Sequence, residues 1–153
     1  MTETTQQLKI TRVFDAPREL VYKAFTDPDQ VAEWFGPVGY HVPRDTVDMD
    51  VRTGGYQKLT MVPDSNEYPP AGPSHGIFDE VIENELIVGH EDFDEEQAKL
   101  FGSPRMSLRI EFHDEGGKTR LVLTQGPYST EFEDMAKQGW LSSFTKLDTL
   151  LAR

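Results

Sequence analysis

Cysteine is absent from this sequence of 153 residues. The chain therefore forms no disulfide and offers no thiolate as a nucleophile or metal ligand. No apolar run approaches the ~20 residues that a transmembrane helix needs. The polar segment 1–9 also lacks the basic start and the apolar stretch of a signal peptide. We therefore expect a protein without a membrane span, and the cytoplasm is its expected location.

Basic residues are scarce. The chain has 15 Lys and Arg against 27 Asp and Glu, a formal net charge of -12. Such a charge repels phosphate backbones and anionic membranes, so we expect neither nucleic acid nor a membrane as a partner. The acidity is explained by solubility, although it also suits a protein partner with a basic face. With 37% hydrophobic residues the chain can build a core, and its length is typical of one domain. We expect residues 1–153 to form a single domain.

The first forty residues predict one strand and two short helices. Residues 7–14 alternate between apolar and polar, as a strand does. Asp15 as N-cap, followed by Pro17, predicts a helix, and Asp27-Pro28 repeats that signal. The apolar faces of the two helices carry residues at helical spacing: Leu20, Val21, Ala24 and Phe25, then Val31, Trp34 and Phe35.

From residue 40 to residue 126 the apolar period is two, which predicts strands. The expected strands are 40–50, 56–62, 76–83, 86–93, 106–112 and 121–123, so the whole sheet has about seven. Their short connections predict antiparallel pairing. Segment 63–74 holds four prolines and is predicted to lack regular structure. The acidic segment 94–104 is interpreted as a loop or a helical turn.

The end of the chain gives the strongest local pattern. Thr130 and Glu133 have the spacing of a capping box, and apolar residues then recur every three or four positions to about Arg153. A helix of this length carries one long apolar stripe, which must lie across the sheet. Gly139 interrupts the stripe at a cost of up to about 1 kcal/mol. We interpret it as a close backbone approach or as room left for something else.

Six segments, in this order, resemble the bacterial proteins of the Activator of Hsp90 ATPase homologue 1-like family, within the START-like helix-grip superfamily. They are Arg12–Pro17, Val21–Phe25, Trp34–Pro37, Asp50–Gly55, Thr119–Leu121, and Gly139-Trp140 with Leu147–Leu150. The resemblance implies an α+β helix-grip fold, in which a curved antiparallel sheet wraps a long C-terminal helix. It also implies a cavity between sheet and helix, but no shared chemistry.

Candidate lining residues of such a cavity share an inward position on the predicted elements. They are Trp34, Phe35, His90, Met106, Leu108, Leu121, Leu123, Met135 and Trp140. Any one of them could instead simply fill the core. Trp34, His90 and Trp140 are the most informative, because each carries a polar ring nitrogen that needs a partner when buried. Such a nitrogen could also orient a ligand that carries an oxygen.

Two charged positions raise more specific hypotheses. His90 and Asp92 lie on one side of a strand, where a carboxylate beside an imidazole could support acid–base catalysis. Arg12 lies on the apolar face of the first strand and must be paired or reach the rim; Asp79 and Glu80 are the predicted partners. The other histidines show no metal-ligand spacing, and we expect no metal and no cofactor.

Three functions remain open. The favoured one is non-enzymatic binding of a small hydrophobic or amphipathic ligand. The second is an interaction module for an Hsp90-type chaperone, as the family resemblance implies. The third is a cyclase or hydrolase that uses His90 and Asp92.

Overall fold

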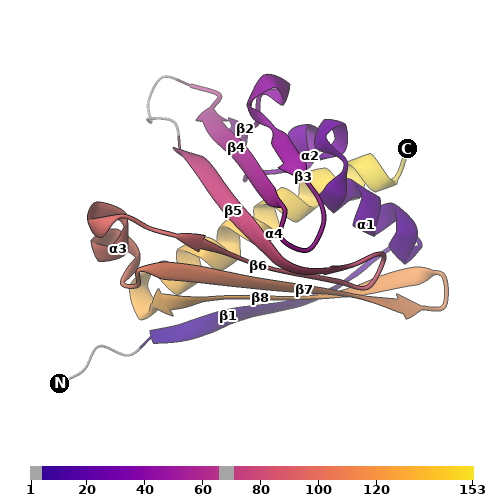
Figure 1. Cartoon of the computed structure of the whole chain (residues 1–153). Coiled ribbons are helices and arrows are strands. Elements are labelled where there is room, and N and C mark those ends of the chain that lie inside the picture. Colours follow the sequence, from indigo (N-terminus) through magenta and orange to yellow (C-terminus); the bar gives the residue numbers. More distant parts are fainter. Residues whose placement is uncertain (1–4, 66–70) are drawn as a thin grey trace.

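The computed structural model describes residues 5–65 and 71–153 (Figure 1). Eight strands and four α-helices follow one another, with one 3₁₀ turn. Their bounds are β1 Thr5–Phe14, α1 Arg18–Thr26, α2 Pro28–Trp34, β2 Tyr40–His41, the 3₁₀ turn Arg44–Thr46, β3 Asp48–Asp50, β4 Tyr56–Pro63, β5 Ala71–Ile82, β6 Leu86–Asp92, α3 Glu95–Phe101, β7 Arg105–Glu115, β8 Lys118–Ser129 and α4 Thr130–Leu151.

The strands form one antiparallel sheet in the order β1-β8-β7-β6-β5-β4-β2, and β3 also pairs with β4. In Figure 1, β4 and β5 rise steeply away from β1, β7 and β8, so the sheet is strongly bent. Helix α4 packs chiefly on β1, β8 and α2. The predicted α+β helix-grip fold is therefore confirmed. Because a straight helix follows only part of a bent sheet, α4 leaves the inner faces of β4 to β6 without a close helical neighbour.

The main core lies where α4 meets β1 and β8. Phe144 and Leu147 of α4 are fully buried there, as are Leu8 and Phe14 of β1. The rings of Phe14 and Phe144 meet edge to face, with centroids 5.2 Å apart. A second, smaller core of Val31, Val42, Val47 and Leu59 adjoins the first, and Phe35 and Met49 pack against both. Burying each such side chain contributes about 1.5–3 kcal/mol.

Helix starts were predicted with mixed success. Asp27 caps α2 as expected, and its carboxylate accepts a hydrogen bond from the Asp29 backbone N–H. Asp15 does not cap α1. Pro17 keeps an extended ψ of 150°, so that helix begins only at Arg18 and the Asp15 side chain is 92% exposed. Of the apolar residues predicted on the inner face of this helix, Val21, Ala24 and Phe25 are buried, but Leu20 is 51% exposed. Helix α4 begins at Thr130 with Ser129 as its N-cap, one residue before the predicted cap.

The predicted strand 40–50 and the proline-rich segment differ from expectation, whereas the acidic segment takes the helical one of its two predicted forms. Pro43 and the 3₁₀ turn after it split the predicted strand 40–50 into β2 and β3. Strand β5 starts at Ala71, inside the segment predicted to be irregular, and Pro73 lies where the β4–β5 register shifts. A bulge tolerates proline because its backbone N–H is not needed for the ladder. Residues 66–70 of that segment lie outside the described residues. The acidic segment forms α3, started by an Asp94–Gln97 capping box.

Arg12 pairs with a different element from the one predicted. Its guanidinium makes two hydrogen bonds to the carboxylate of Asp148 on α4, one of them 2.8 Å long, and not to Asp79 or Glu80. The guanidinium also lies 4.6 Å from the centre of the Phe14 ring. The prediction failed because β1 pairs with β8 and faces α4. In the order of the sheet, β8, β7 and β6 lie between β1 and β5.

Candidate functional site

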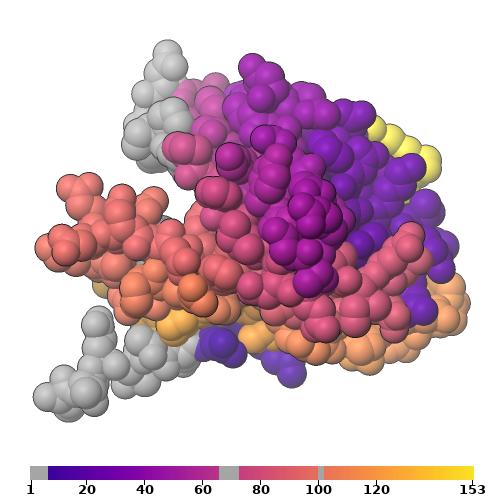
Figure 2. Space-filling model, viewed as in Figure 1, coloured from indigo at the N-terminus to yellow at the C-terminus, as the bar shows by residue number. Residues whose placement is uncertain are grey.

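A cavity of about 490 Å³ lies between α4 and the bent part of the sheet. Helix α2 and the residues after it close one side, and β4 to β8 supply the opposite wall. Near α3 the wall includes Phe93 and Gln97, and Figure 2 shows α3 projecting from the body of the protein. This volume falls in the range of small-molecule sites.

Glycines on the cavity wall differ in the space beside them. Gly76 on β5 pairs with Gln57, and Gly89 on β6 pairs with Phe78 on one side and Leu108 on the other. An added Cβ at Gly76 would come no closer than 3.8 Å to a neighbouring atom, whereas at Gly89 it would lie 2.6 Å from the Ile77 carbonyl oxygen. Gly89 is therefore explained by a close backbone approach and not by open space. At Gly139 on α4, an added Cβ would meet no atom within 4 Å. Of the two interpretations of Gly139, the structure therefore supports room left open, because no backbone approaches closely.

Most of the predicted lining residues do lie on the wall: Trp34, Phe35, His90, Met106, Leu108 and Trp140. The ring of Phe35 lies between two tryptophans, with centroid distances of 5.5 Å to Trp34 and 5.7 Å to Trp140. Trp34 is fully buried, and its indole N–H donates to the Ala24 carbonyl at 2.8 Å. Its ring nitrogen is thus occupied within the fold and does not face the cavity as a free donor.

Leu121, Leu123 and Met135 lie elsewhere, which corrects their predicted place. Leu121 and Leu123 are fully buried in the core between β1 and α4, where helix and sheet are in direct contact. Met135 is 65% exposed. It precedes Ala136, which lines the cavity, and one helical step of about 100° turns the Met135 side chain away from the sheet.

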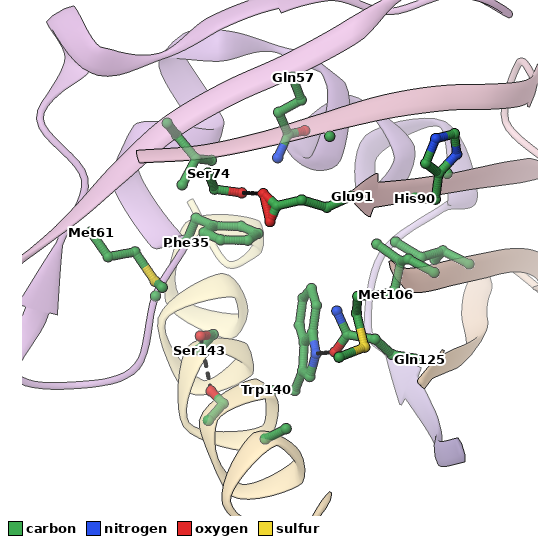
Figure 3. A pocket seen from close by; sticks show the side chains of 18 of the residues that line it. Phe35, Gln57, Met61, Ser74, His90, Glu91, Met106, Gln125, Trp140 and Ser143 are labelled. Atoms are coloured by element: carbon green, nitrogen blue, oxygen red, sulfur yellow. Dashed lines mark hydrogen bonds between the residues drawn. The ribbon is translucent and has the colours of Figure 1, made fainter. Parts of the chain in front are cut away.

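Several polar side chains on the wall were missed by the sequence analysis, and Gln125 and Glu91 are the two with the most hydrogen bonds there. Gln125 of β8 accepts hydrogen bonds on its side-chain oxygen from the Trp140 indole and from the Tyr128 hydroxyl, both at 2.8 Å (Figure 3). Burial raises the pKa of Tyr128, which therefore keeps its proton. Glu91 of β6 points into the cavity, where its Oε1 accepts from Ser74 Oγ at 2.9 Å and from the His75 backbone N–H at 2.7 Å.

The alternation along β6 could have predicted that the Glu91 side chain points inward. Ile87, Gly89 and Glu91 follow one another at a period of two, and the first two are buried on the inner face of β6. A carboxylate continuing that row is directed inward. Gln125 likewise continues the inward row that Leu121 and Leu123 begin on β8. Polar residues at inward positions were therefore the detectable feature.

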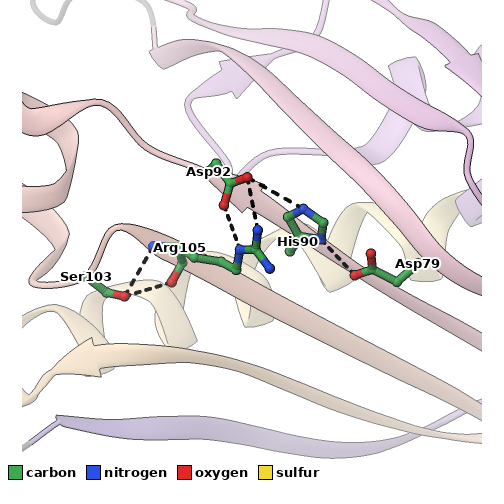
Figure 4. A network of polar contacts seen from close by, with 5 residues as sticks. All are labelled: Asp79, His90, Asp92, Ser103 and Arg105. Carbon is green, nitrogen blue, oxygen red and sulfur yellow. Dashed lines mark hydrogen bonds and ion pairs between the residues drawn. The ribbon is translucent and has the colours of Figure 1, made fainter.

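The same alternation turns the side chains of the proposed acid–base pair, His90 and Asp92, outward. The His90 imidazole contacts Asp79 Oδ2 through Nδ1 at 2.8 Å, while its Nε2 lies 3.7 Å from Asp92 (Figure 4). Asp92 is bound by Arg105, whose hydrogen bonds lower the pKa of that carboxyl group. His90 thus forms part of the wall through its strand, but its ring lies in a network on the opposite face. The geometry required for catalysis by His90 and Asp92 in the cavity is not met.

Two kinds of site are absent from residues 5–65 and 71–153. No group of three His, Cys, Asp or Glu side chains there is placed to hold a metal ion. No helix in the same ranges is long and apolar enough to cross a membrane.

Comparison with known proteins identifies relatives of this chain. A family model described as Activator of Hsp90 ATPase homolog 1-like protein matches residues 15–152. A crystal structure from Chromobacterium violaceum is 25% identical, with a TM-score of 0.79, covering 96% of this chain and 97% of that one. An AHSA1 protein from Silicibacter pomeroyi is 23% identical, with a TM-score of 0.77 and coverage of 96% and 98%. A structure from Nitrosomonas europaea is 21% identical, with a TM-score of 0.76 and coverage of 95% and 94%. No curated protein matches the sequence.

Proposed function

The chain belongs to the Activator of Hsp90 ATPase homolog 1-like family, and on that basis we propose that it binds a small hydrophobic or amphipathic molecule in the cavity beside α4. The observation that carries this proposal is the open space at Gly139. A helix interior normally disfavours glycine, and here no neighbouring atom requires it. Glycine at this position costs stability and leaves space on a largely apolar wall. Such a residue is expected where a ligand must fit.

The wall offers enough apolar surface for useful affinity. Aromatic rings of Phe35 and Trp140 face the cavity from one side, and Met106 and Leu108 face it from the sheet. A molecule that removes about 250 Å² of apolar surface from water gains about 6 kcal/mol. Part of that gain is lost in fixing the molecule in place. A gain of about 6 kcal/mol corresponds to a dissociation constant of about 40 μM, so after that loss we expect values from tens of micromolar to millimolar for a ligand of good shape.

Ligand binding is tested by native mass spectrometry and thermal shift with fatty acids, sterols and aromatic polyketides. Gly139→Phe should fill the cavity and abolish binding, whereas the matched variant Gly139→Ala adds one carbon and should retain it. Circular dichroism checks that both variants fold. The proposal fails if no compound stabilises the wild-type protein, or if Gly139→Phe binds as well as Gly139→Ala.

A second candidate function is an interaction with an Hsp90-type chaperone, as a co-factor that raises its ATPase rate. It is favoured by the family match and by a net charge of -12, which would suit a basic face on the partner. The ATPase rate of an Hsp90-type chaperone is measured with and without an excess of this protein. An unchanged rate removes the candidate and leaves the ligand proposal untouched.

A further inference from the structure

Glu91 sets the electrostatic character of the cavity. Among the described residues on the wall it is the only Asp or Glu, and neither Lys nor Arg lies beside it there. His90 is the wall residue whose side chain can become positively charged, but its ring is turned to the outer face of the sheet. A carboxylate on an apolar wall without a cation attracts a positive or hydrogen-donating group.

The carboxylate is held so that one oxygen remains open. Both hydrogen bonds that Glu91 receives, from the Ser74 hydroxyl and the His75 backbone N–H, go to Oε1. Within the described part of the chain Oε2 accepts none, and Figure 3 shows it turned toward the cavity. Oε1 thus fixes the side chain while Oε2 is left to bind a ligand.

A second polar group lies on the neighbouring part of the wall. The oxygen of the Gln125 amide is occupied by Trp140 and Tyr128. These two donors fix the orientation of the amide, and its Nε2 faces the cavity (Figure 3). Nε2 has two hydrogens to donate, which suits a neutral oxygen on a ligand. The wall therefore combines an anionic acceptor at Glu91 with a neutral donor at Gln125.

We propose that this cavity selects ligands with an aromatic or alicyclic body and a protonated amine, which pairs with Glu91 Oε2, and that it rejects carboxylates. This inference rests on the proposed ligand-binding function and narrows its ligand class. An anionic head group would bring a second negative charge close to Glu91, and the two charges repel each other. The net charge of -12 acts in the same direction at longer range.

The test uses three 2-naphthyl compounds that share a two-carbon chain and end in an ammonium, a hydroxyl or a carboxylate. Dissociation constants are measured by calorimetry on the wild-type protein, Glu91→Gln and Asp92→Asn. Asp92→Asn is the matched control, because it removes the same charge from the next residue, on the opposite face. In the wild type we expect the amine to bind at least tenfold more tightly than the carboxylate, with the alcohol between them.

Glu91→Gln should reduce the preference for the amine over the carboxylate, measured as the ratio of their affinities, at least tenfold. It should change the dissociation constant of the alcohol less than threefold. Asp92→Asn should leave the ratio within threefold of the wild-type value. Equal binding of amine and carboxylate to the wild type overturns the inference, and that comparison needs no variant. Equal effects of the two substitutions also overturn it, since they would show a response to net charge alone.

The experiment also separates this inference from the function on which it rests. If the alcohol and the neutral hydrocarbon 2-ethylnaphthalene bind but the charged pair shows no preference, the selection by Glu91 is wrong and ligand binding stands. If none of the four compounds binds at millimolar concentration, the ligand-binding function is wrong, and the inference falls with it.

Discussion

The indole N–H of Trp140 on α4 donates a hydrogen bond to the side-chain oxygen of Gln125 on β8, over 2.8 Å. This bond joins helix and sheet at the edge of the cavity, beyond the region where their apolar side chains interlock. Tyr128 donates to the same oxygen from the end of β8. The Gln125 amide therefore has a fixed orientation, set by one donor from α4 and one from β8.

Replacing each tryptophan with phenylalanine should have unequal effects on stability. Trp140→Phe should lower the free energy of unfolding by about 0.5–1 kcal/mol, because Gln125 keeps its bond from Tyr128. Trp34→Phe should cost more, about 1–3 kcal/mol, because it leaves the buried Ala24 carbonyl without its indole donor. Urea denaturation followed by circular dichroism measures both. Equal losses would show that the shared acceptor at Gln125 does not matter.

Two glycines on the cavity wall should respond oppositely to alanine. Gly139→Ala should stabilise the protein by up to about 1 kcal/mol, because alanine favours the helix and the added Cβ meets no atom within 4 Å. Gly89→Ala should destabilise it by about 1–3 kcal/mol, because its Cβ would lie 2.6 Å from the Ile77 carbonyl oxygen. Chemical denaturation measures both variants. A loss of stability in Gly139→Ala would mean that this part of α4 is more crowded than the structure shows.

Local patterns predicted the elements of this fold well. The strand period, the Asp27-Pro28 signal and the long stripe of α4 each depend on residues close together in the sequence. The place of α3 was left open, although Asp94 and Gln97 already had capping-box spacing. Leu121 and Leu123 were correctly placed on an inward face, but periodicity does not say which inward residues meet the helix and which meet empty space.

Partners across the fold were harder to predict than faces. The partner of Arg12, Asp148, is 136 positions away in the sequence, and only the β1–β8 pairing brings α4 above Arg12. Glu91 and Gln125 were missed for a related reason. The apolar residues in the inward rows predicted the aromatic part of the wall. The polar residues in the same rows, which were not predicted, define what the cavity can recognise.

The Arg12–Asp148 pair should contribute a modest, measurable coupling energy. Both side chains are partly exposed, at 31% and 44%, so solvent screens the pair. Two hydrogen bonds and the nearby Phe14 ring favour the upper part of the range for such pairs, about 0.5–1 kcal/mol. A double-mutant cycle with Arg12→Met and Asp148→Asn measures the coupling at low and high salt. Additive effects of the two substitutions would show that the pair adds nothing to stability.

Glu111 should give the protein a defined pH dependence of stability. Hydrogen bonds from Arg109 Nε at 3.0 Å and His113 Nε2 at 2.8 Å lower the pKa of this carboxyl group from its ordinary 4.5. The unfolded chain therefore binds the proton more readily, and the stabilisation is fully present above the unfolded pKa. It is lost as the pH falls through the lower, folded value.

Glu111→Gln removes this titration. The wild type should exceed the variant in stability at pH 6, and the difference should shrink between about pH 5 and pH 3, where the wild-type carboxylate takes up its proton. Urea denaturation at each pH measures the difference. Glu115→Gln is a suitable control, since Glu115 is also a β7 carboxylate bound by an arginine, Arg120, but no histidine among the described residues pairs with it. A difference that stays constant over this pH range would show that Arg109 and His113 do not stabilise the charged form of Glu111.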